Sequence, residues 1–153
     1  MNRLPILKRM IFSINEIFEN RLIVSELTRS WLDSESSESG GHEEGGFIIA
    51  DDVGNLSVIR WQKGLQSEIV LPPHKNCFVD EKDIVVSFHT HPNTGRGFQQ
   101  EPSLTDIRAI SDDFDLKGEF YLGELVISKQ NIYLIEPAGD YHIIGATEFM
   151  LER

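Results

Sequence analysis

The chain has 153 residues, 40% of them apolar, which is enough for one globular domain with its own hydrophobic core. Its 25 acidic and 14 basic residues give a formal net charge of -11, which argues against nucleic acid as a partner because phosphates attract a basic surface. The single cysteine, Cys77, excludes a disulfide framework within the chain, so a reducing compartment is expected.

The first twenty residues are compatible with two local structures. Residues 9–14 suit a strand, whereas Ile14, Ile17 and Phe18 fall at helical spacing. Polar residues interrupt the apolar run after Phe12 too early for a signal peptide. No apolar stretch approaches the length that spans a bilayer. We therefore expect a cytoplasmic protein without a membrane partner.

A strand, a helix and a loop are predicted next. Residues 21–24 are short, apolar and partly β-branched, which favours a strand. Ser25 is a suitable N-cap for a helix in which Leu27 and Trp31, four residues apart, share the buried face. Residues 34–41 contain only serine, glutamate and glycine, so they are expected to form a flexible surface loop.

From Gly46 onward the pattern is that of β-strands. Residues 47–50 and 56–61 predict two strands separated by a polar turn at residues 51–55. The strongest predicted strand covers residues 83–91. Its side chains alternate between two faces, with Ile84, Val86 and Phe88 on one face and Val85, Ser87, His89 and His91 on the other.

The last third predicts one helix and several strands. Pro102 and Ser103 open a helix whose core-facing positions recur at helical spacing, namely Leu104, Ile107, Ile110 and Phe114. Strands are predicted at residues 119–122, 125–128, 132–135 and 141–144, with a hairpin turn at residues 129–131. The chain is thus expected to be a single domain over residues 1–153. Its class is α/β (α+β), a mixed central β-sheet with flanking helices.

Two histidines and a carboxylate form a candidate metal site. Side chains two apart on a strand point the same way, so His89 and His91 project together. Ser103 and Asp106 share one face of the predicted helix. Where that face meets the strand end, three protein ligands leave one tetrahedral position open, which is typical of catalytic zinc. Iron, manganese and cobalt remain alternatives for this donor set.

A hydrolytic site also needs a carboxylate that accepts a proton from water and passes it to the leaving amine. Glu43 and Glu44 both stand just before Gly45, Gly46 and a predicted buried strand. At the level of the residues alone, either glutamate can fill this role.

These residues resemble the JAMM motif of the JAB/MPN+ metalloproteases. The matching elements occur in the family's order, as Glu43-x-Gly45-Gly46, His89-x-His91-Pro92 and Pro102-Ser103-x-x-Asp106. The resemblance implies a JAB/MPN (deaminase-like) fold and a zinc peptidase or isopeptidase that cleaves after the C-terminal glycine of a ubiquitin-like protein. It assigns zinc binding to His89, His91 and Asp106. It makes Glu43, three residues before Gly46, the general acid/base, and Ser103 a stabiliser of the oxyanion.

One segment departs from the family pattern. Residues 92–102 form a longer run between the second histidine and the serine than the family usually has. Longer loops add little closure entropy, so the site is compatible with the insertion. Thr105 is an alternative hydroxyl, although the Ser103-x-x-Asp106 register favours Ser103. Phe98 lies on this glycine-containing loop, and we expect it to contact substrate.

The resemblance leaves several functions open. Small JAB domains occur in bacterial operons beside a ubiquitin-like protein and its E1-like and E2-like enzymes, including antiphage systems. Trimming of a sulfur-carrier protein is a variant of the same chemistry. A non-catalytic MPN-type scaffold typically lacks the metal ligands that this chain retains. A DNA-repair-linked JAB-like domain is disfavoured by the charge of -11.

Overall fold

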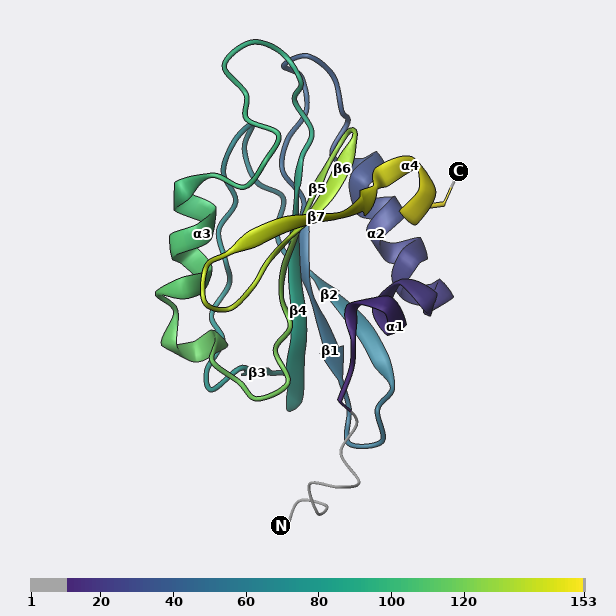
Figure 1. Cartoon of the computed structure of the whole chain (residues 1–153), viewed down its shortest axis with the longest axis vertical. Helices are drawn as coiled ribbons and strands as arrows, with labels where there is room; N and C mark the ends of the chain where they lie inside the picture. Colours follow the sequence, from purple (N-terminus) through teal and green to yellow (C-terminus); the bar gives the residue numbers. More distant parts are fainter. Residues whose placement is uncertain (1–10, 153) are drawn as a thin grey trace.

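The structure is a computed structural model that describes residues 11–152 as a mixed β-sheet with helices on both faces (Figure 1). The elements in chain order are α1 (Ile14–Glu19), α2 (Arg21–Asp33), β1 (Gly45–Ala50), β2 (Leu56–Arg60), β3 (Phe78–Val79), β4 (Lys82–His91), α3 (Leu104–Ser111), the 3-10 helix η2 (Phe114–Leu116), β5 (Gly123–Ser128), β6 (Asn131–Ile135), β7 (Tyr141–Ala146) and α4 (Thr147–Met150). The expected α+β class with a mixed sheet is confirmed. Part of the strand expected at residues 9–14 lies outside the described residues.

The seven strands form one sheet in the order β2-β1-β4-β5-β6-β7, with β3 paired to the start of β4. Neighbouring strands are antiparallel except β4 and β5, which run parallel. Parallel neighbours need a long crossover, and here it carries α3 and η2. Helix α3 lies on one face of the sheet, whereas α1, α2 and α4 lie on the other (Figure 1).

Each face of the sheet has its own hydrophobic core. On the α1 and α2 side, buried residues include Leu27, Val86 and Phe88. On the α3 side, Ile110 and Leu116 pack with buried strand residues. Burying one such side chain contributes about 1.5–3 kcal/mol to the free energy of folding, so each core stabilises the packing of the helices on its face of the sheet.

A β-bulge in β4 changes the predicted alternation. Ile48 of β1 pairs with Val86 and Ile49 pairs with Ile84, so Val85 has no partner of its own. Ile84 therefore packs in the α3-side core, and Val85 packs in the opposite core with Val86. The prediction for Ile84 and Val85 was wrong, because an extra residue reverses the faces on one side of a bulge.

The N-terminal segment is helical. Helix α2 begins at Arg21, so the strand predicted at residues 21–24 was wrong and Ser25 lies inside the helix rather than at its N-cap. The N-cap is Asn20, whose side chain accepts hydrogen bonds from the backbone of Leu22 and Ile23. A side chain that caps two amides outweighs the weak β preference of four residues. Leu27 is buried in α2, as predicted.

The C-terminal half agrees with the prediction except at three places. The hairpin of β5 and β6 is confirmed, and β7 forms where a strand was expected. Residues 119–122 form a turn and irregular chain instead of a strand. Leu104 and Phe114 are 60% and 91% exposed, so only Ile107 and Ile110 of the predicted helical stripe pack against the sheet.

The Ser/Glu/Gly segment at residues 34–41 is tied to the loop that follows β4. Ser37 forms a parallel bridge with Asn93, and the backbone amides of Thr94 and Gly95 donate to carbonyls of the segment. The side chain of buried Asn93 accepts from the Gly41 amide and donates to the Gly41 and Gln66 carbonyls. The expected surface loop is exposed in its side chains but hydrogen-bonded in its backbone. Within residues 11–152, none of the helices has the length and hydropathy that crossing a membrane requires.

Candidate metal centre

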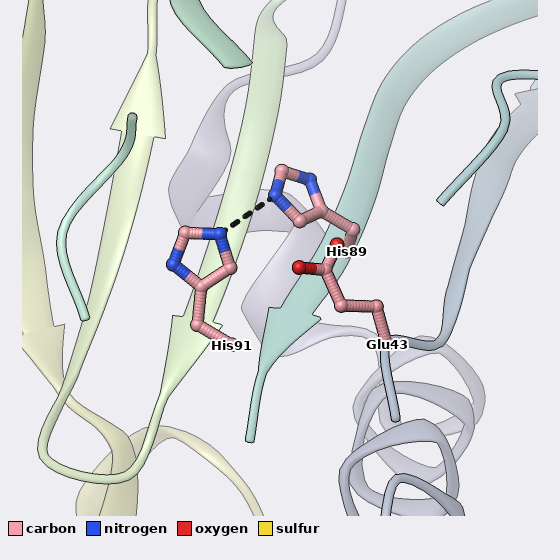
Figure 2. A group of neighbouring side chains, drawn as sticks. All are labelled: Glu43, His89 and His91. Carbon is pink, nitrogen blue, oxygen red and sulfur yellow. Dashed lines mark hydrogen bonds between the residues drawn. The ribbon is translucent and has the colours of Figure 1, made fainter. Parts of the chain in front are cut away.

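The end of β4, the segment before β1 and the first turn of α3 bring the candidate ligands together. His89 and His91 are buried at the end of β4 and point to the α3 side of the sheet. Glu43 lies two residues before the start of β1, in which Gly45 is paired with His89. Asp106 lies one turn inside α3. Figure 2 shows the two imidazoles facing each other with the Glu43 carboxylate beside them.

The distances between these atoms are close to the ligand spacing of a tetrahedral metal site, with the two Asp106 distances measured to different carboxylate oxygens. The Nε2 atoms of His89 and His91 are 3.1 Å apart. Oδ1 of Asp106 lies 3.4 Å from His89 Nε2, and Oδ2 lies 3.2 Å from His91 Nε2. Ligand atoms about 2.0–2.1 Å from a tetrahedral zinc ion lie about 3.3 Å from one another. One ligand atom of Glu43 also lies within 4.8 Å of those of both histidines. The residues therefore fit a small divalent cation.

The hydrogen bonds of the two rings fix their tautomers. His89 Nδ1 lies 2.8 Å from Oε2 of Glu124, and His91 Nδ1 lies 3.0 Å from the carbonyl oxygen of Gln100. Both partners are acceptors, so each Nδ1 donates its proton and each Nε2 is left facing the other ring and Asp106. In the metal-free protein burial opposes a charge on His89, but Glu124 and Asp106 raise the pKa of this imidazole well above its usual value. A cation that displaced the Nε2 proton would meet two imidazole lone pairs and the Asp106 carboxylate directed at one point.

Buried charge has the same implication. Three carboxylates surround the imidazole pair, those of Glu43, Asp106 and Glu124, and within residues 11–152 no lysine or arginine lines the adjoining cavity. Burial raises the pKa of Glu43 to about 7, and Asp106 and Glu124 add to the rise although the histidines oppose it. Burial also works against a low pKa at Asp106, but the imidazoles of His89 and His91 hold that pKa well below its usual value. A divalent cation would compensate this concentration of negative charge.

Glu43, and not Glu44, faces the centre. The Glu44 carboxylate binds Arg60 at 2.6 Å through one oxygen and His42 at 2.5 Å through the other. The backbone of Glu43 pairs with the chain after β2, because its amide donates to Leu65 and its carbonyl accepts from Gly64. This pairing fixes the place from which the Glu43 side chain enters the site.

Ser103 holds Asp106 through a capping box. Its hydroxyl accepts from the Asp106 amide at 3.0 Å, and its own amide donates to Asp106 Oδ2 at 2.8 Å. Ser103 also lines a cavity of about 390 Å³ beside the histidines, together with exposed Thr105 and half-buried Phe98. All the residues that the sequence singled out for this site thus lie around one cavity.

The other histidines and the cysteine lie apart from this centre. His74 binds the Pro72 carbonyl and Asp113, and His142 is exposed on β7. The Cys77 thiol is buried and donates to the Ile84 carbonyl. Burial raises the pKa of Cys77 to about 11, which keeps it a neutral thiol.

Sequence reasoning missed Glu124 and the Gln100 carbonyl, which hold the outer nitrogens of the histidines. The available signal was one carboxylate inside β5, an otherwise apolar strand that is buried along its whole length. A backbone carbonyl leaves no signal in the sequence. Comparison of the chain with models of protein families, with curated proteins and with solved structures gave no match.

Proposed function

We propose that this chain is a zinc-dependent peptidase or isopeptidase of the JAB/MPN+ type that cleaves after the C-terminal glycine of a ubiquitin-like protein. The observation that carries the proposal is the convergence of His89, His91 and Asp106 at tetrahedral spacing, with Glu43 next to them. The proposal includes the JAB/MPN architecture, since the ligands occupy the strand end and first helical turn that the JAMM motif implies.

Each residue then has one task. His89, His91 and Asp106 would hold the ion, which supplies a Lewis acid for the scissile carbonyl and for water. Glu43 would accept a proton from the attacking water and deliver it to the leaving amine, a role that suits a buried carboxyl beside the two histidines. Ser103 would donate its hydroxyl proton to the carbonyl oxygen as negative charge develops there.

The cavity supports a slender, extended substrate. Its walls come from residues 66–71, from the loop at residues 97–99 and from α3, so a chain can pass between them and reach the histidines. Ile69, Leu71 and Phe98 supply apolar contacts. A peptide tail that ends in glycine has no side chain at that position, so it fits a narrow part of the cavity beside the metal ligands. The expected partners are a ubiquitin-like protein and the E1-like and E2-like enzymes that conjugate it, in the cytoplasm.

The test combines metal analysis with a cleavage assay on an aminocoumarin amide of a peptide ending in Gly-Gly. Purified protein should hold about one zinc per chain and release the fluorophore. Glu43→Gln should keep the zinc and lose cleavage, whereas His89→Ala should lose both. Glu44→Gln is the matched control and should keep both. A zinc-free wild-type protein, or normal cleavage by Glu43→Gln, would refute the proposal.

A further inference from the structure

We propose that Glu124 is a positioning residue that orients His89 and tightens its hold on a divalent cation. The inference rests on the proposed metal site and assigns a task to a residue outside the ligand set. The contact that carries it is the hydrogen bond of 2.8 Å from His89 Nδ1 to Glu124 Oε2. Both residues are buried, at 2% and 4% exposure, so water does not compete for this bond.

The parallel pairing of β4 and β5 places Glu124 under the histidines. Ser87 is opposite Glu124 and His89 is opposite Val126, so Glu124 and His89 share a face of the sheet. A slip of one residue would turn the carboxylate to the other face. Gly123, the residue before Glu124, permits the close approach of β6 to β5, since its φ is +126° and a Cβ there would lie 2.1 Å from the Ile135 carbonyl oxygen.

The two histidines have unequal outer partners. His91 donates to a neutral carbonyl on a loop, whereas His89 donates to an anion on a central strand. A charged acceptor makes a hydrogen bond roughly twice as strong as a neutral one, and it makes the ring a more basic metal ligand. His89 is therefore the firmer of the two ligands, and Glu124 is the reason.

Glu124 carries a desolvation cost that its hydrogen bond to His89 offsets at one oxygen only. Its Oε1 is buried and has no hydrogen-bond partner among the described residues, and no lysine or arginine lines the cavity beside it. A buried carboxylate that is half satisfied destabilises a fold. A neutral residue of the same shape would serve packing better, so the charge at this position serves the ion.

The experiment compares Glu124→Gln with wild type by zinc competition against a chromophoric chelator. The substitution keeps the shape and removes the charge, and we expect zinc binding to weaken by about 10–100-fold. The unfolding free energy of the EDTA-treated variant should fall by less than its zinc-binding free energy, because glutamine can still accept the His89 proton, whereas a merely structural role would lower both equally. Glu44→Gln, which changes a similarly buried glutamate that pairs with Arg60 and His42 and not with His89 or His91, should bind zinc as wild type does.

The outcomes separate this inference from the proposed function. Wild type that binds no zinc refutes the proposed function. Zinc binding by wild type and Glu124→Gln with equal strength refutes the role of Glu124 alone. A variant that loses apo stability in step with zinc binding marks Glu124 as structural and also overturns the inference. Cobalt-loaded protein gives a second readout, because a displaced His89 ring should shift the visible absorption bands of Glu124→Gln.

Discussion

Replacing Glu43 with glutamine should stabilise the metal-free protein in alkaline solution. Burial keeps the pKa of Glu43 at about 7, against 4.5 in the unfolded chain. Between these two values the unfolded chain releases the proton while the folded protein retains it, so stability falls as the pH rises. A difference of about 2.5 pKa units corresponds to about 3 kcal/mol, fully expressed above about pH 8 and reduced to about 1 kcal/mol near pH 5.

The assay is urea unfolding of EDTA-treated wild type and Glu43→Gln at both pH values. Glutamine cannot ionise, so the variant should exceed wild type by about 3 kcal/mol near pH 8 and by about 1 kcal/mol near pH 5. Glu44→Gln should have the opposite effect, a loss of about 1–3 kcal/mol, because it weakens the pair with Arg60. Equal stability of Glu43→Gln and wild type at the higher pH would refute the burial argument.

Three further substitutions or reagents test other features. Gly123→Ala should lower the unfolding free energy by about 3 kcal/mol or more, measured by urea unfolding, because a Cβ would collide with the Ile135 carbonyl. Asn93→Ala should cost about 2–3 kcal/mol in the same assay, since it removes three hydrogen bonds, two of which pair the buried backbone groups of Gly41. Ellman's reagent near pH 8 should label Cys77 at least about 100-fold faster in denatured than in native protein, as its raised pKa and burial predict.

The parts of the site that depend on the periodicity of a single strand or helix could be predicted from the sequence. His89 and His91 share a face because strands alternate, and Ser103 reaches Asp106 because a capping box spans three residues. These relations depend on neighbours in the chain and survive in any fold that keeps the strand and the helix. The candidate ligands therefore met as expected once α3 packed beside the end of β4.

The parts that were missed depend on pairing between distant segments. The bulge at Val85 arises where the register between β1 and β4 shifts, and the sequence of residues 83–91 has no pattern that predicts it. Glu124 meets His89 only through the parallel register of β4 and β5. Residues 21–24 include two β-branched side chains, yet this segment is helical because Asn20 caps the helix and Leu27 lies on its buried face.

The crossover between β4 and β5 has a consequence for how the protein matures. The histidines leave the ribosome well before β5, so a nascent chain that ends in this connection has Glu43, His89 and His91 but lacks the strand that carries Glu124. Parallel neighbours with a long connection pair late, because the loop must close before any ladder bond forms. Tight binding of an ion at the proposed site would thus be reserved for chains that have completed the sheet, and ion uptake during refolding would report that last step.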